Sequence, residues 1–154
     1  VSNAKSDISA QSIYYIKDNG YYGYSFTARG NVIINNDDNK ISGAEIIYVD
    51  STQHMSILED ASIINQNQKL IGENIFIQFK DSSINEIAID KDPIVYNKIR
   101  ARLSENTIEE HFTDIMKGES MIIKYSDNIT AIIIGDGESK YHYIHQAKQL
   151  NQAL

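Results

Sequence analysis

Three segments of the sequence share a pattern built around a glycine, and this pattern restricts the chain to a few fold types. In each copy an apolar residue lies two positions before the glycine, and two more lie three and five positions after it. The copies are 41–48, 70–77 and 116–123, with Gly43, Gly72 and Gly118 at equivalent positions. The second and third copies continue with Phe79 and Tyr125, and the neighbouring positions Gln78, Lys80, Lys124 and Ser126 are polar. Alternation of this kind gives a β-strand one apolar and one polar face. Three copies in order predict a stack of such strands.

Short polar segments separate the apolar stretches at regular intervals. They are rich in Asn, Asp, Ser and Gly, which tolerate turn conformations, and they lie at 17–20, 35–39, 65–68, 80–83 and 126–128. A second apolar stretch follows each copy of the pattern, at 55–57, 87–89 and 132–134. The repeating unit is therefore a β-hairpin, and its spacing is typical of an all-β sandwich, barrel or solenoid.

The interval between the second and third copies is longer than the first interval. Gly43 and Gly72 lie 29 residues apart, whereas Gly72 and Gly118 lie 46 apart, so the second interval holds 17 extra residues. The excess falls at 97–113, where the alternation changes. We expect the chain to leave the regular stack there and to return for the third copy.

Part of this excursion carries a helical signal. Thr107 and Glu110 match a capping box, in which each side chain caps a backbone N–H of the first helical turn. Ile108, Phe112 and Ile115 would share one helical face. The sequence therefore predicts one short helix near 107–113, although a strand that leads into the third copy competes with it from Asp114 onward.

The length of 154 residues fits one domain. We expect residues 10–154 to form it, and residues 1–9 to be a tag, a leader or a disordered start. A leader that has been cut away and a longer parent chain are both compatible with this sequence. No stretch approaches the about 18 consecutive apolar residues that a membrane-spanning helix requires.

Charge and cysteine content exclude several classes of partner. The formal net charge is −7 and the pI is near 5.0, whereas nucleic-acid binding needs a basic face. We therefore expect no nucleic-acid partner. The chain has no cysteine, so it forms neither disulfides nor thiolate metal sites.

The sequence offers no arrangement typical of an enzyme. It has four histidines, His54, His111, His142 and His145. The last two lie three positions apart, which places them on opposite faces of a strand and argues against shared metal binding. No catalytic triad, phosphate loop or metalloprotease motif is present. We therefore expect a protein without catalytic residues, metal or cofactor.

The repeat resembles the OstA-like family of periplasmic lipopolysaccharide-transport proteins. The family pattern has a glycine-asparagine-valine strand, a glycine-led strand and a return strand. Here residues 28–34 contain Gly30-Asn31-Val32, and the glycine-led copy at 41–48 follows. The closing stretches 116–121 and 135–141 resemble variants in larger members of the family. The resemblance covers roughly residues 10 to 145 and is carried by three copies in order, since each motif is short.

The resemblance implies a twisted, open β-jelly roll whose stacked antiparallel strands form a V-shaped trough. It implies a non-enzymatic protein of the periplasm that binds lipopolysaccharide acyl chains during transport to the outer membrane. The implied partners are lipopolysaccharide or a related lipid, and other transport-complex proteins that join by end-to-end strand pairing. A homo-oligomer is compatible with this mode of assembly. The 17-residue excursion departs from the compact family pattern.

Two sets of residues are candidates for contact with a lipid. The inward positions of the repeat and of its return strands would line the trough: Ile46, Tyr48, Ile57, Ile75, Ile77, Phe79, Ile87, Ile89, Met121, Ile123, Tyr125, Ile132 and Ile134. Basic side chains alternate with apolar ones at Lys98, Arg100 and Arg102, and this row could meet head-group phosphates. A solvated edge strand protected by charge is an alternative for the basic row.

The same residues support one alternative for the whole chain. A stripe of apolar strand positions also forms a closed hydrophobic core. The alternative protein is a structural β-solenoid scaffold with a filled interior and end-to-end assembly. An open or a filled cross-section distinguishes it from a lipid carrier.

Overall fold

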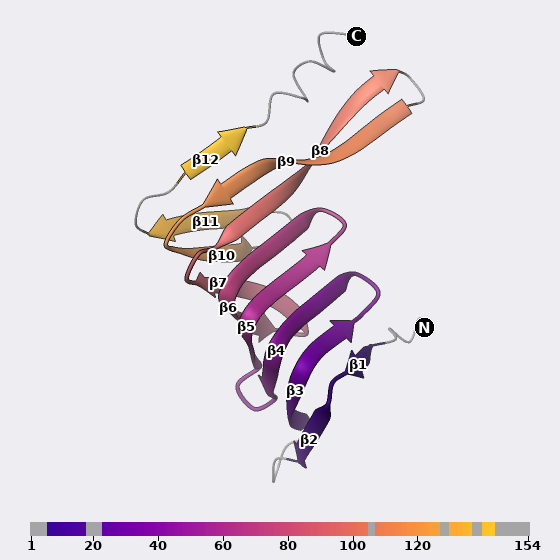
Figure 1. Cartoon of the computed structure of the whole chain (residues 1–154), viewed down its shortest axis with the longest axis vertical. Coiled ribbons are helices and arrows are strands. Elements are labelled where there is room, and N and C mark those ends of the chain that lie inside the picture. Colours follow the sequence, from indigo (N-terminus) through magenta and orange to yellow (C-terminus); the bar gives the residue numbers. More distant parts are fainter. Residues whose placement is uncertain (1–5, 18–22, 105–106, 127–129, 137–139, 144–154) are drawn as a thin grey trace.

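A computed structural model shows a chain made of antiparallel strands stacked from one end to the other (Figure 1). The structure describes residues 6–17, 23–104, 107–126, 130–136 and 140–143. Within these ranges there is no helix, and so none that is long and apolar enough to cross a membrane. The predicted all-β, open antiparallel fold is confirmed.

Twelve strands are described. They are β1 (Asp7–Ser9), β2 (Ser12–Lys17), β3 (Tyr24–Asn35), β4 (Asn39–Val49), β5 (His54–Asn65), β6 (Gln68–Lys80), β7 (Ser83–Asp90), β8 (Ile94–Ser104), β9 (Thr107–Lys117), β10 (Ser120–Ser126), β11 (Thr130–Asp136) and β12 (Lys140–Tyr143). The strands β1 and β2 lie at one end of the stack, and β11 and β12 lie at the other (Figure 1).

The four long strands β3 to β6 run through a bend, and the sheet is divided there into two halves. One half, the β1 half-sheet, holds β1, the end of β3, the start of β4, the end of β5, the start of β6, β8, β9 and β12. The other half, the β2 half-sheet, holds β2, the remaining parts of β3 to β6, β7, β10 and β11.

The bend has a local cause in each long strand. The pairing register shifts at one place between β3 and β4, between β4 and β5 and between β5 and β6. Such bulges bend a strand and re-aim its side chains. Two of these bulges contain residues with a left-handed backbone: Gly30 and Asn31 in β3, and Glu59 and Asp60 in β5. Glu59 and Asp60 therefore bend a continuous strand and do not mark a strand end.

Two glycines of the repeat lie at the bend for a packing reason. A Cβ atom on Gly43 would lie 2.7 Å from Ile57 Cγ2, and one on Gly72 would overlap Ile89 Cγ2. Only a residue without a side chain lets the adjacent strand pack so closely. The third glycine, Gly118, lies in the break between β9 and β10, so the bend there separates two strands instead of bending one.

Three rows of apolar residues cross the strands on the inner faces. The base row of the β2 half-sheet, next to the bend, is Ala28, Ile46, Ile57, Ile75, Ile89 and Met121. The middle row of that half-sheet is Phe26, Tyr48, Met55, Ile77, Ile87 and Ile123. The facing row of the β1 half-sheet is Ile8, Ile34, Ile41, Ile63, Leu70, Val95 and Met116. These rows belong to one hydrophobic cluster.

The helix predicted near 107–113 is wrong, because this segment lies in strand β9. The 17-residue excess forms the hairpin of β8 and β9, which projects beyond the stack (Figure 1). In the strand register, the segment from Lys98 to Arg102 pairs with the segment from Ile108 to Phe112. Tertiary pairing therefore overrides the local capping signal.

Candidate functional site: an apolar groove between the half-sheets

A groove of about 750 Å³ lies between the two half-sheets at the N-terminal end of the stack. Its walls come from both halves. The β1 half-sheet contributes Ile8, Ile34 and Ile41, and the β2 half-sheet contributes Phe26, Tyr48, Met55 and Phe79. The alternation of each strand places these side chains inward. The site is therefore an open space whose strand residues are mainly apolar, while turn residues such as Asp37, Asp50 and Ser82 add polar groups.

Aromatic rings form a series along the β2 wall of this groove. The ring centroids of Phe26 and Tyr48 are 5.8 Å apart, and those of Tyr48 and Phe79 are 6.2 Å apart with an edge-to-face orientation. Tyr15 of β2 continues the series, 6.2 Å from Phe26. Such pairs hold broad apolar surfaces in defined orientations. The wall is consequently wide, apolar and built of rings that contact one another.

The hydroxyl group of Tyr48 keeps its proton. Its Oη donates a hydrogen bond of 3.1 Å to Asp50 Oδ1, and the Asp50 backbone N–H donates one of 3.0 Å to Ser25 Oγ. Burial raises the pKa of Tyr48, and the hydrogen bond and the negative charge of Asp50 raise it further. The ring thus brings no charge into the groove at neutral pH.

A second space, of about 570 Å³, adjoins the groove at its mouth and is lined mainly by side-chain amides. We call it the amide hollow. Asp38, Asn39 and Ile84 line both spaces. Turn geometry accounts for the amide-rich rim: Asn36 Oδ1 accepts the backbone N–H of Asn39 at 2.7 Å. Side chains that cap their own turns are common in loops of this kind. A polar rim therefore borders an apolar interior.

A chain of hydrogen bonds crosses from one half-sheet to the other inside this hollow. Tyr125 Oη of the β2 half-sheet donates to Gln68 Oε1 of the β1 half-sheet at 3.3 Å. Gln68 Nε2 then donates to Asn97 Oδ1 at 2.9 Å. We call these three residues the clasp. Burial raises the pKa of Tyr125, so its hydroxyl keeps its proton for this bond.

The predicted trough residues divide into two groups according to their burial. Eight are buried in the packed rows: Ile46, Ile57, Ile75, Ile77, Ile87, Ile89, Met121 and Ile123. Three are half-buried and line the hollows: Tyr48, Phe79 and Tyr125. These side chains belong to the core cluster or pack against it, and most of them contact other core side chains instead of open space.

The last two predicted positions, Ile132 and Ile134, lie on β11, and only their backbone register is described. Ile134 is paired with Ile122, and Ile132 is paired with Lys124, and both partners are exposed. Ile133, by contrast, is paired with the buried Ile123. The side chains of Ile132, Ile133 and Ile134 lie outside the described ones, so the assignment of Ile132 and Ile134 to the trough stays a prediction.

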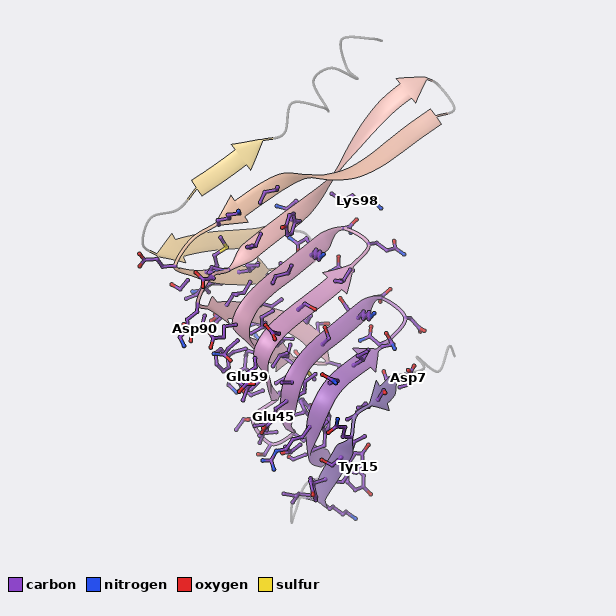
Figure 2. All side chains as sticks on the ribbon, viewed as in Figure 1. Asp7, Tyr15, Glu45, Glu59, Asp90 and Lys98 are labelled. Atoms are coloured by element: carbon purple, nitrogen blue, oxygen red, sulfur yellow. The ribbon has the colours of Figure 1, made fainter. Side chains whose placement is uncertain are left out.

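The predicted basic row lies on β8. Lys98 lines the amide hollow and is half-buried, while the side chains of Arg100 and Arg102 lie outside the described ones. The first part of the strand, from Ile94 to Asn97, pairs with both β6 and β9, whereas in the described register the part that carries the basic row pairs with β9 alone. Figure 2 shows Lys98 on the side of the stack opposite Glu45, Glu59 and Asp90, which follow the bend.

Sequence reasoning missed the wall opposite the aromatic series and part of the series itself. The facing row residues Ile34 and Ile41 and the middle row residues Phe26 and Met55 were not among the predicted ones. A signal was present, since Ile41 and Leu70 are the apolar residues two positions before the repeat glycines. They lie on the far side of the bend and so belong to the other half-sheet.

Among the described side chains, no group of three or more His, Asp or Glu residues is placed to hold a metal ion. His54 is exposed at the start of β5. The side chains of His111 and His142 lie outside the described ones, and so does all of His145. The described site therefore combines apolar, aromatic and amide side chains with Asp37, Asp38, Asp50 and Lys98.

Comparison with known proteins gives a likeness of fold. Neither the protein-family models nor the curated proteins contain a match. Among solved structures, the chain is similar to LptH, the LptA-homologous periplasmic component of the lipopolysaccharide transport device of Pseudomonas aeruginosa. The TM-score is 0.59 and the identity 12%, over 87% of this chain and 83% of LptH. The chain thus has an LptA-like jelly-roll fold.

Proposed function

We propose that this protein is a non-enzymatic carrier that holds the acyl chains of a lipid in the groove between its half-sheets. The observation that carries the proposal is the composition of the groove walls. Apolar side chains from both half-sheets, including Ile34, Phe26 and Phe79, surround about 750 Å³ of open space. This volume falls in the roughly 300–1,000 Å³ range of sites that hold small ligands.

The groove fits an acyl chain better than a polar ligand. Each methylene group moved from water into an apolar site gains about 0.8 kcal/mol. The aromatic series of Phe26, Tyr48 and Phe79 offers a flat wall along which a chain could lie. Because the Tyr48 hydroxyl is paired with Asp50, the wall presents a satisfied polar group to the lipid.

The lipid we propose is lipopolysaccharide or a related lipid, bound in the periplasm on its way to the outer membrane. Support comes from the LptA-like fold and from the similarity to LptH, which is a periplasmic component of a lipopolysaccharide transport device. Strands β2 and β11 are edges of the described sheet, and unpaired edges accept added strands. Neighbouring transport proteins, or further copies of this chain, would join there.

The scaffold alternative is less well supported. A β-solenoid with a filled interior requires packed rows from one end to the other. The base row fits this requirement, since Ile46 and Ile57 are fully buried. The half-buried Phe26 and Tyr48 beside an open groove do not fit it.

Site-specific photocrosslinking tests the proposal. A photoreactive phenylalanine analogue at Phe79, in the groove wall, should capture a lipid in bacterial cells that make lipopolysaccharide, and mass spectrometry should identify the adduct. The matched control carries the analogue at Lys124, which is exposed on β10. Adducts at Lys124 and none at Phe79 would contradict lipid binding in the groove.

A further inference from the structure

We infer that the end of the stack formed by β2 binds a membrane surface, and that a lipid passes from that surface into the groove. The second part of the inference rests on the proposed function, because it takes the groove to be the lipid site. Two observations carry it: exposed apolar side chains gather at this end on both faces of the sheet, and a series of aromatic rings leads from there into the groove.

Four of the five large hydrophobic residues that are exposed in the described part of the chain lie at this end. They are Tyr14, Tyr15 and Ile16 of β2 and Tyr24 of β3, each between 55% and 63% exposed. We call these four residues the aromatic tip, and Figure 2 shows Tyr15 at the end of the stack. The fifth, Ile122 of β10, is 36% exposed. Exposed apolar residues that gather in this way mark a contact surface, whereas single ones are normal.

The aromatic tip is apolar on both faces of the sheet. Tyr15 is paired with Phe26 of the groove wall, so it lies on the inner face. Tyr14 and Ile16 precede and follow Tyr15 on β2, so they lie on the outer face. A strand added at the edge of β2 would pair with its backbone in the plane of the sheet and leave the outer face uncovered. The interfacial layer of a membrane, by contrast, surrounds both faces of a sheet end that enters it.

The residue types of the aromatic tip fit this interfacial layer. A tyrosine combines an apolar ring with a hydroxyl group that stays hydrated, and tyrosines are enriched where acyl chains meet water. The charged residues of β2 and of its paired stretch 24–29 are Lys17 and Arg29, which are both basic. Arg29 forms an ion pair of 3.2 Å with Glu45, while Lys17 is exposed beside the tip. Although the formal net charge of the chain is −7, this stretch holds no acidic residue that lipid phosphates would repel.

The aromatic series connects the tip to the groove. The ring centroids of Tyr15 and Phe26 are 6.2 Å apart. From Phe26 the series continues through Tyr48 to Phe79 along the groove wall. An acyl chain that leaves a membrane at the tip therefore stays in contact with apolar rings until it lies in the groove. This continuity favours a lipid surface over a protein neighbour as the occupant of the tip.

A fluorescent reporter tests the contact in the whole chain. The chain has no tryptophan, so Tyr14→Trp places a single reporter on the outer face of the tip. With vesicles of phosphatidylcholine, which carry no net charge, we expect its emission to shift to shorter wavelengths and to be quenched by brominated acyl chains. The matched control, Ile122→Trp, places the reporter at the exposed residue outside the tip, and its emission should not change. An unshifted spectrum of Tyr14→Trp overturns the inference.

A double variant assigns the contact to the side chains named. Replacing Tyr14→Ser and Ile16→Ser together should weaken cosedimentation with these vesicles about tenfold. Urea unfolding should be unchanged, because both side chains are exposed. Ile122→Ser is the matched control and should cosediment like the parent. Unchanged cosedimentation of the double variant overturns the inference, and so does binding that requires anionic phosphatidylglycerol, since charge would then govern the contact.

A fluorescent fatty acid, cis-parinaric acid, separates the inference from the proposed function. The double variant should bind it in solution as tightly as the parent, but its transfer from vesicles to the chain should slow about tenfold, in line with the weaker vesicle contact. An unchanged transfer rate overturns lipid entry at the tip. If the parent binds the fatty acid but not the vesicles, the inference fails and the proposed function stands. If it binds the vesicles but not the fatty acid, the proposed function fails, and lipid entry fails with it. Self-association that the double variant abolishes, without vesicle binding by the parent, would assign the tip to a second copy and overturn the inference.

Discussion

The two ends of the middle row differ although they follow the same strand alternation. At the N-terminal end, Phe26 and Tyr48 are half-buried and border the open groove. At the C-terminal end, Ile87 is 1% exposed and Ile123 is 0% exposed. In the facing row burial increases from the half-buried Ile8 to Val95, which is 0% exposed, and the last residue, Met116, is again half-buried. One pattern therefore produces an open site at one end and a closed core at the other.

Side-chain shape and one hydrogen bond explain the difference between the ends. Compact isoleucines of the closed end pack against the facing row, whereas the aromatic rings of the open end stack along one wall and leave space in front of them. The clasp through Tyr125 and Gln68 ties the half-sheets together nearest the closed end. Stability and binding should consequently depend on opposite ends of the same row.

The largest expected effect is the loss of a core side chain at the closed end. Ile77→Ala removes a fully buried side chain and should lower the free energy of unfolding by about 2–5 kcal/mol. Phe26→Ala, at the open end, removes a half-buried ring and should cost clearly less, yet it should weaken lipid binding. Urea unfolding of both variants measures the comparison. Equal losses of stability would show that the open end is packed as tightly as the closed end.

The next effect concerns the bend that both ends share. Gly72→Ala would bring a Cβ atom onto Ile89 Cγ2, and overpacking of this kind costs typically about 1–3 kcal/mol. Gly43→Ala, nearer the open end, meets Ile57 Cγ2 at 2.7 Å and should cost less. Urea denaturation compares the two variants. A more stable Gly72→Ala protein would contradict the close approach of strands at the bend.

The sequence predicts the base row well because its determinants are local. Glycine followed by alternating isoleucines identifies Ile46 and Ile75 as inward without knowledge of the partner strands. The opposite wall requires knowledge of the bend, since Ile41 and Ile46 belong to one strand but to different half-sheets. Five positions separate Ile41 from Ile46, so strand alternation alone assigns them to opposite faces, and the bulge between Ser42 and Glu45 is what turns both inward.

Two other features depend on contacts that are distant in sequence. The clasp joins Tyr125 to Gln68, which are separated by 57 positions. The strand at 107–117 depends on its pairing with β8, and its isolated sequence favours a helix start at Thr107. Local patterns therefore establish the fold class and the core, whereas distant pairing decides where the interior is open.

A smaller effect is expected from the clasp itself. Tyr125→Phe keeps the ring and removes the hydrogen bond to Gln68 Oε1, which should cost about 0.5–1.5 kcal/mol of stability. Release of a bound acyl probe should become faster, because the half-sheets lose a link beside the amide hollow, which adjoins the groove. Stopped-flow displacement measures this rate. The matched control is Tyr14→Phe, which changes an exposed tyrosine of β2. An unchanged release rate from the Tyr125→Phe protein would mean that the clasp does not limit lipid exchange.

The smallest effect distinguishes the ends by their response to alkaline pH. Burial raises the pKa of both Tyr48 and Tyr125 above the ordinary tyrosine value of 10.0, and Asp50 adds to the increase at Tyr48. The unfolded chain loses these protons first. The contribution of these two tyrosines to the free energy of unfolding is therefore complete below pH 10.0. It declines as the pH rises towards and through the raised pKa of each tyrosine in the folded state. The free energy of unfolding is measured across this pH window for the parent protein and for Tyr48→Phe and Tyr125→Phe. It should decline less steeply in each variant than in the parent. If the free energy of unfolding declines as steeply in Tyr48→Phe as in the parent, the prediction is contradicted. Tyr48 would then be as exposed to water in the folded chain as in the unfolded chain.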